Sequence, residues 1–574
     1  MGKRQGRAVH VDSLTLRVER LGPLPIINHF VEKLDLERTL DRFVPTDDGR
    51  VKLPYAKALG VFLRSVLVER EPIYRQQELV SSFAPDQFGL QTELIDSVGD
   101  DAVGRALSRL FDADRGAILT SVVIAATEAF SIKIDELHND STTIHFCGQY
   151  KTAGGRSIRG KKAPYITYGY SKDHRPDLKQ LLFIMTTTED GAVPVQFRSE
   201  AGNCNDSRTH EESWNALCKA TGRKDFLYVA DSKLCNQEAL DYIDKHGGRI
   251  VTVIPRSRHE DSEFRKWIQD HEPEWELVWD RPHPRRRYGP RDRWWVRRHH
   301  IPSLEGWPVI WVYSSLMKLK QQQTRRERIA KATEQVEQLN QKLTGPRPRK
   351  RKRREIYEQI EEILAGNKVT RYLKVKVIAD EEHSFRQATR GRPGAKTRYV
   401  RKTRKFFRLE WTLDEEAIAH DRKSDGMYPL LTNDKSLSPA QVLEAHKRQP
   451  SIEKRFSQTK TVFEIAPVFL KNEDRVEAMF FVYFLALLVQ SLIERELRLA
   501  MKREGLESLP IYPEERHSNR PTCEQVFRLF SIAQRNTLLD HGRTVRVFET
   551  ELTDLQKQIL DLLEIPHGVY RAHT

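Results

Sequence analysis

Between residues 131 and 254, short apolar runs separated by turn residues replace the helical spacing that precedes them. Apolar runs of this length, bounded by turn residues, are typical of strands. We predict strands at about residues 142–146, 180–187, 193–197, 226–230 and 249–254. Helical spacing separates the last three runs, at about residues 211–220 and 237–246. This order predicts a mixed α/β core over residues 131–255, although alternation alone fits several α/β folds.

The region before this core has a different spacing. From about residue 24 to residue 128, apolar residues recur at intervals of three and four. That interval is typical of amphipathic helices, so we predict an N-terminal helical domain over residues 1–130. A packing domain and a DNA-recognition module are both compatible with such helices.

Residues 256–411 interrupt the predicted core and contain the most basic runs of the chain. One run, at residues 281–300, places Trp294 and Trp295 among arginines. Cations in such a run can contact phosphates, while a tryptophan stacks on a base. The alternative is a basic β-hairpin with packed tryptophans, and for either tryptophan alone we favour it.

The same insertion contains a heptad-like stripe over residues 329–343 and a second apolar stripe over residues 356–363. A basic run at residues 345–354 lies between them and includes two prolines. We therefore predict an antiparallel helical hairpin with a basic tip. The tip either contacts DNA or is a solvated linker held extended by repulsion between like charges.

After the insertion, the pattern predicts a return to the core over residues 412–470 and a C-terminal helical region over residues 471–574. The longest apolar run, residues 478–489, is too short to cross a membrane, so we expect a buried core helix and no membrane partner. The formal net charge of +15 favours a polyanionic partner, because a basic surface releases counterions when it binds nucleic acid.

Two further features concern the compartment. The basic first residues are followed by no apolar leader segment, which makes secretion unlikely for this sequence. The 5 cysteines form no Cys-x-x-Cys pair, which argues against a disulfide framework and against structural zinc. We therefore expect a cytoplasmic protein.

Three carboxylates on separate predicted elements form the candidate site. Asp140 and Asp231 lie at the borders of apolar runs, which places them at strand ends, and Glu453 lies on a predicted helix. Taken singly, they would be a turn former, a helix cap and a solvated helix residue. Brought together, three carboxylates can hold two divalent metal ions and leave coordination positions for a phosphate and a nucleophile. Without metal they should raise one another's pKa.

Several strings around these residues resemble one family. They are Ser-Lys-Asp-His-Arg-Pro-Asp-Leu-Lys-Gln at residues 171–180, Asp-Gly-Ala-Val-Pro at 190–194, Gly-Asn-Cys-Asn-Asp at 202–206, and the spacing Glu453-x6-Lys460. Together they resemble bacterial insertion-sequence DDE transposases, whose third carboxylate lies in a Tyr-x2-Arg-x3-Glu-x6-Lys signature. The resemblance extends from about residue 16 to about residue 498.

The resemblance implies an RNase H-like mixed sheet with flanking helices, in which Asp140, Asp231 and Glu453 are catalytic and ligate metal. The expected cofactors are two Mg²⁺ ions, with Mn²⁺ as a substitute. It further implies a transposase that binds the terminal inverted repeats of its element, cleaves them and joins the 3′ ends to target DNA, by cut-and-paste rather than copying. The partners are double-stranded DNA, at element ends and target, and a second copy in a homodimer assembled on DNA. The implied location is the bacterial cytoplasm, at the nucleoid.

The glutamate segment departs from the family pattern at two positions. His446 stands at the signature's tyrosine and Gln449 at its arginine, while Arg448, one position away, is a candidate replacement that contacts DNA. These departures support an alternative, a DNA-binding regulator that has kept the fold and lost the chemistry. A second alternative is an RNase H-like nuclease without element-end specificity.

Other cations are candidate DNA contacts. Lys460 lies seven residues after Glu453, on the same face of a continuous helix, and can hold a phosphate near the scissile bond. The loop string adds candidate strand-positioning residues, which are Lys172, His174, Arg175 and Lys179. Pairing of these cations with Asp173 and Asp177 is the structural alternative.

Overall fold

The computed structural model describes residues 14–148, 150, 154–172, 175–205, 209–286, 288–345, 352–463, 470, 472–548 and 550–571. The chain divides into two compact units. The first, here called the core unit, comprises Met1–Thr252 and Glu444–Thr574, and the second, the insertion unit, comprises Val253–Leu443. Each unit is described separately below.

The core unit contains a mixed sheet in the strand order β6-β5-β2-β7-β8. Its strands are β2 (Glu136–Phe146), β5 (Lys179–Thr188), β6 (Pro194–Ala201), β7 (Leu227–Ala230) and β8 (Arg249–Val253). β2, β5 and β6 pair antiparallel, whereas β7 runs parallel to both β2 and β8. Helices α7 (His210–Thr221) and α8 (Gln237–Lys245) connect β6 to β7 and β7 to β8. The predicted order of strands and helices, and the mixed α/β class, are confirmed.

One strand differs from its prediction. β2 begins at Glu136, six positions before the predicted start, so that Asp140 lies inside a strand and not at its end. Most of the added residues are polar, and among them Glu136, His138 and Asn139 are buried and hydrogen-bonded within the protein. Apolar character alone therefore could not reveal where this strand begins.

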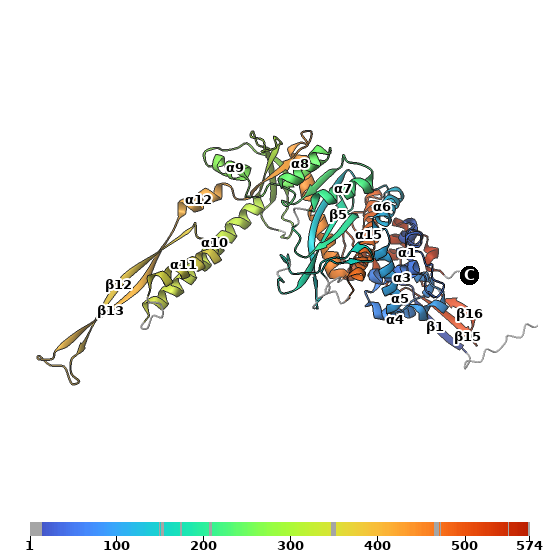
Figure 1. The fold of residues 1–574 in the computed structure, drawn as a ribbon, viewed down its shortest axis with the longest axis horizontal. Helices are drawn as coiled ribbons and strands as arrows, with labels where there is room; N and C mark the ends of the chain where they lie inside the picture. Colours follow the sequence, from blue (N-terminus) through green and yellow to red (C-terminus); the bar gives the residue numbers. More distant parts are fainter. Residues whose placement is uncertain are drawn as a thin grey trace, which may run out of the picture. The chain divides into compact units, whose positions relative to one another are not determined.

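The predicted N-terminal helices are present and share one apolar core with a long C-terminal helix, α15 (Glu473–Arg503) (Figure 1). They are α1 (Leu24–Lys33), α2 (Leu36–Phe43), α3 (Tyr55–Val68), α4 (Gln76–Ser82), α5 (Asp100–Asp112) and α6 (Arg115–Phe130). By length and composition α15 could cross a membrane, with a mean hydropathy of 2.1 over its most apolar stretch. However, 94% of that stretch is buried inside the protein, which confirms the predicted core helix.

A small antiparallel sheet joins the two ends of the core unit, with strand order β1-β15-β16. It consists of β1 (Leu14–Arg20), β15 (Gln534–Asp540) and β16 (Arg543–Phe548), and it is accompanied by α16 (Cys523–Phe530) and α17 (Asp554–Leu562). The sequence analysis anticipated only helices in these regions. A further short pair is formed by β3 (Ser157–Ile158) and β4 (Lys161–Lys162).

The insertion unit contains an antiparallel sheet in the order β14-β11-β10-β9. Its strands are β9 (Glu276–Arg281), β10 (Asp292–Arg298), β11 (Val309–Ser314) and β14 (Met427–Thr432), and the helices α9 (His259–Asp270) and α12 (Glu415–Lys423) accompany them. β14, which lies in the span anticipated as the returning core, pairs with β11.

The predicted helical hairpin is also present in this unit, as α10 (Ser315–Thr344) and α11 (Arg353–Gly366). The two predicted stripes form its buried seam, which includes Val336 and Leu339 on α10 and Ile356 and Ile360 on α11. Its predicted basic tip falls largely on residues 346–351, outside the described residues. A two-stranded ribbon of β12 (Leu373–Gln387) and β13 (Tyr399–Leu413), which the sequence analysis missed, packs on the hairpin (Figure 1).

Candidate active site

Strand register brings the first two carboxylates together. β2 and β7 run parallel, with Asn139 opposite Ala230, so the next residues along the two strands are Asp140 and Asp231. Asp231 directly follows β7, as expected from the sequence. The backbone N–H of Lys233 donates to its Oδ1 at 2.9 Å, which fixes the carboxylate in a turn. Adjacent positions on neighbouring parallel strands are a suitable place for two carboxylates that bind the same pair of metal ions.

Asp140 has a lysine beside it. Lys172 Nζ lies 3.9 Å from Asp140 Oδ1 and donates to the carbonyl and hydroxyl oxygens of Ser141 at 2.7 and 2.6 Å. The backbone N–H of Ser141 donates to the same Asp140 oxygen at 2.7 Å. Of the loop cations proposed from the sequence, Lys172 is therefore held against the first carboxylate.

Glu453 lies in the first turn of a separate helix, α14 (Pro450–Ser457), and is exposed. The preceding helix, α13 (Pro439–Arg448), ends just before Pro450, so the proline begins a new helix, where its missing N–H costs nothing. Gln449, between the helices, donates from Nε2 to the carbonyl oxygen of Asn139 at 2.9 Å. The start of the glutamate helix is thus tied to the residue next to Asp140.

The three carboxylates influence one another electrostatically. Burial, with smaller contributions from the negative charges of Asp231 and Glu453, raises the pKa of Asp140 to about 6, and Lys172 opposes this shift. In the described part of the chain, no three His, Cys, Asp or Glu side chains are already gathered around a common ion position. The oxygen-only donor set nevertheless suits Mg²⁺, and a cation would relieve the cost of ionising Asp140.

We expect Asp140→Asn to stabilise the metal-free protein at pH 8. A pKa raised from 3.8 to about 6 means that ionised Asp140 destabilises the fold, by an upper limit of about 3 kcal/mol at 1.36 kcal/mol per pH unit. Because the folded-state pKa is the higher one, this cost is absent well below pH 4 and complete above pH 6. Thermal unfolding in EDTA should show that the variant is more stable than the wild type at pH 8, and that the difference in stability is smaller at pH 5. A variant less stable than the wild type at pH 8 contradicts this.

A buried polar network, which the sequence analysis missed, lies beside the site. Glu136, His138 and Asp140 alternate along β2 and so share one face of the strand. His138 lies between two acceptors, Glu136 Oε1 at 2.8 Å and Gln449 Oε1 at 3.0 Å. Burial tends to raise the pKa of Glu136, but hydrogen bonds from His138 and Arg448 outweigh it and lower that pKa to about 2. The alternation Glu-x-His-x-Asp was the sequence signal that could have revealed this face.

Two of the three residues in question, Arg448 and Gln449, have structural partners. Arg448 forms two hydrogen bonds of 2.7 Å with Glu136 and lies 3.3 Å from Glu189. Gln449 is buried with the contacts given above, and burial lowers the pKa of His446 to about 4. Arg448 and Gln449 attach the end of α13 and the start of α14 to β2, so the departure at Gln449 coincides with a packing position.

Lys460 does not lie on the α-helix that carries Glu453. α14 ends at Ser457, and the π-helix Gln458–Val462 follows, with the N–H of Phe463 bonded to the carbonyl of Gln458. A π-helix turns less per residue than an α-helix, which rotates Lys460 away from the face predicted for a continuous helix.

The remaining loop cations have protein contacts. Arg175 makes a two-pronged ion pair with Asp177 at 2.9 and 2.8 Å, the structural alternative stated above. Lys179 Nζ donates to the carbonyl oxygen of Tyr150 at 3.2 Å. His174 and Asp173 lie outside the described residues. A DNA contact by any of these cations remains a prediction.

The two tryptophans belong to β10 of the insertion unit and point to opposite faces. Trp294 is buried, packs edge-on against Trp279, and donates from Nε1 to Asp292 at 2.8 Å. Trp295 is half-buried and stacks on Tyr313, its cross-strand neighbour, at 4.8 Å between ring centroids. Trp294 therefore has a packing role, and base stacking by Trp295 remains a prediction.

Comparison with solved structures finds distant likenesses. The cryo-EM structure of the piggyBac transposase synaptic complex with hairpin DNA has a TM-score of 0.36 and 9% identity, covering 90% of this chain and 82% of that chain. The Mos1 transposase paired-end complex with left transposon end has a TM-score of 0.14 and 12% identity, covering 32% and 58%. The Mos1 mariner paired end complex with Mn gives the same score and identity, covering 32% and 59%. No curated protein matches the sequence.

The family comparison is more direct. The model of the family described as "Transposase DDE domain" matches residues 133–489. This span includes Asp140, Asp231 and Glu453 together with the whole insertion unit, and it exceeds half of the 574 residues. The chain therefore belongs to the DDE transposase family.

Proposed function

We propose that the protein is a DNA transposase that binds the terminal inverted repeats of its mobile element, cleaves them and joins the 3′ ends to target DNA. The observation that carries the proposal is the parallel register that sets Asp140 beside Asp231, with Glu453 close enough to raise the pKa of Asp140. Family membership supports the same chemistry. An RNase H-like core is the fold that we infer for this arrangement.

In this proposal Asp140, Asp231 and Glu453 hold two Mg²⁺ ions, with Mn²⁺ as a substitute. Such a pair of ions activates the attacking oxygen and stabilises the leaving oxygen in phosphoryl transfer. Asp140 must be ionised to act as a ligand, and Lys172, 3.9 Å away, favours the ionised form before DNA and metal arrive. We propose that the ammonium of Lys172 also contacts the scissile phosphate.

We further propose that duplex DNA is the partner, at the element ends and at the target, and that two copies assemble on it. The net charge of +15 supports a polyanionic partner, because each phosphate neutralised by the protein releases counterions. A bacterial cytoplasmic protein at the nucleoid, moving its element by cut-and-paste, fits this role.

The test is cleavage of a supercoiled plasmid that carries the gene with several hundred flanking base pairs on either side. We expect cuts at two positions that bracket the gene, with Mg²⁺ or Mn²⁺ and not with EDTA, followed by joining of the 3′ ends to a second plasmid. Binding of the flanks without cutting in either metal would indicate a regulator that has lost the chemistry. Metal-dependent cutting without positional preference would indicate a nuclease.

A further inference from the structure

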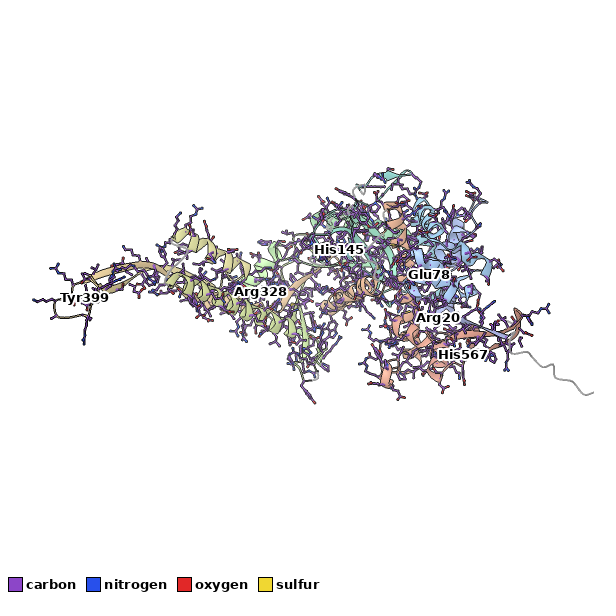
Figure 2. The ribbon with its side chains drawn as sticks, turned by 90° about the horizontal axis from the view of Figure 1, so that it is seen from below. Arg20, Glu78, His145, Arg328, Tyr399 and His567 are labelled. Carbon is purple, nitrogen blue, oxygen red and sulfur yellow. The ribbon has the colours of Figure 1, made fainter. Side chains whose placement is uncertain are left out.

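The distal part of the β12–β13 ribbon, residues 383–402, is here called the arm. Near its base, Arg404 donates to the carbonyl oxygens of Thr344 and Gly345, at 2.7 and 3.1 Å, at the end of α10. The buried ribbon residues nearest to the arm are Val377 and Leu409, and they lie between this anchor and the supported end of the ribbon. Beyond it the ribbon continues past α10 and α11, and Tyr399 lies near its far end (Figures 1 and 2). The arm is thus a two-stranded ribbon without a supporting layer.

The charge pattern of the ribbon changes where the arm begins. Before it, the acids Asp380, Glu381 and Glu382 each pair with a cation on β13, at 2.9, 3.0 and 3.3 Å. Residues 383–402 contain no Asp or Glu. They contain the cations Arg386, Arg390, Arg392, Lys396, Arg398, Arg401 and Lys402. Positive charge is therefore neutralised along the supported ribbon and left in excess along the arm.

The two faces of the arm carry different side chains. Directly opposed residues point to the same face, so Phe385 with Arg401, and Gln387 with Tyr399, line one face. The other face carries the pairs Arg386 with Val400 and Ser384 with Lys402. The ring residues of the first face are exposed, Phe385 by 66% and Tyr399 by 55%. One face therefore combines aromatic, amide and guanidinium groups.

Edge protection alone does not explain this composition. Charged side chains on strand edges do prevent aggregation, but exposed rings oppose that purpose. A two-stranded ribbon is also marginally stable in water by itself. A partner that covers the ribbon and supplies negative charge accounts for both observations.

We propose that the arm enters the major groove of duplex DNA. The groove is about 12 Å wide and admits a two-stranded β-ribbon. From His383 to Gln387 each strand of the arm extends about 16 Å at roughly 3.3 Å per residue, which exceeds the groove's depth of about 8.5 Å. Arg401 and Gln387 carry the groups that pair with guanine and adenine edges, and Phe385 suits a thymine methyl. The arm's other cations contact phosphates. The proposal rests on the proposed function only in taking DNA as the partner.

The first test removes the arm. Residues 384–402 are replaced by Asn-Gly, a two-residue turn that joins the directly opposed His383 and Thr403. Binding to a 30-base-pair duplex of arbitrary sequence is measured by fluorescence anisotropy in EDTA over a range of salt. The slope of log K against log[salt] should become shallower by at least about 3, since each phosphate contact contributes about 0.9. An unchanged slope in a variant that unfolds at the same temperature as the wild type overturns the proposal, and would indicate that the arm binds a partner other than DNA.

The second test compares equal charge losses on one ribbon. Arg386→Ala/Lys402→Ala removes two proposed phosphate contacts from the arm, and Lys374→Ala/Lys376→Ala removes two cations from the supported part of β12. The slope should become shallower by about 2 in the first variant and change little in the second. Equal losses would mean that only net charge matters, and would overturn the assignment to the arm.

The groove and the catalytic proposal are tested separately. Methyl green, a major-groove ligand, should abolish the arm-dependent part of binding, whereas netropsin, a minor-groove ligand, should not. The opposite result overturns insertion into the major groove.

Because binding is measured without metal, an arm-dependent slope in a protein that fails to cleave would refute the proposed function alone. Cleavage with an arm-independent slope would refute this inference alone.

Discussion

Alanine at any one of Asp140, Asp231 and Glu453 is expected to lower DNA cleavage at least about 10³-fold while DNA binding changes by no more than a few-fold. Metal ions contribute several kcal/mol to the stabilisation of developing charge, and about 1.4 kcal/mol corresponds to a tenfold change in rate. Each residue belongs to a different element, β2, the end of β7 and α14. In the proposed complex, contacts to DNA are spread over many cations, so loss of one carboxylate should leave binding nearly intact.

The measurement is metal-dependent plasmid cleavage beside anisotropy on the same flanking DNA. Asp135→Ala is the matched control, because Asp135 is an exposed acid just before β2 whose partner is Arg223, at 2.8 Å. Its variant should cleave at a rate within a few-fold of the wild type. If one of the three alanine variants cleaves as fast as the wild type, that residue does not belong to the catalytic set.

Local patterns in the sequence were sufficient for much of the core. Asp231 follows an apolar strand, β7, whose end is visible from composition, and the alternation of strands and helices around it is confirmed. Asp140 was harder to place, because it lies within β2 among polar residues. Their burial depends on partners such as Gln449, which is 310 positions from Asn139 in the chain. No local pattern contains that information.

The ribbon and the terminal sheet were missed for a related reason. β1 pairs with β15 across more than 500 residues, and neither strand forms a long apolar run. β12 and β13 alternate apolar and charged residues only near their supported end, where Val377 and Leu409 are buried. Further out, charge dominates both strands, which is more typical of a loop. The regularity there comes from backbone pairing between the two strands.

Arg455→Met is expected to destabilise the core unit by about 3–5 kcal/mol, the usual cost of leaving a buried charge without its partner. Arg455 is buried and donates to Glu494 at 2.9 Å, and also to the carbonyl oxygens of Gly191 and Ala192 in the turn between β5 and β6. It thereby attaches α14 to both α15 and the sheet. Because Glu453 lies two residues earlier on the same helix, cleavage should fall even where the variant remains folded.

Thermal and urea unfolding measure the loss of stability. Two further variants show whether that loss comes from the ion pair between Arg455 and Glu494. Arg498→Ala removes a second, more exposed partner of Glu494, 3.1 Å away, and should cost less. Arg455→Met/Glu494→Leu removes both charges and should recover most of the stability without restoring cleavage.

Burial tends to raise the pKa of Glu494, but Arg455 and the other cations hold it below its ordinary value. In the wild type this contribution is present above the ordinary carboxylate pKa and is lost on acidification, whereas in Arg455→Met the carboxylate protonates more readily. The difference in unfolding free energy between the two proteins should therefore narrow as the pH falls below about 4.5. A difference independent of pH would mean that Arg455 acts through packing alone.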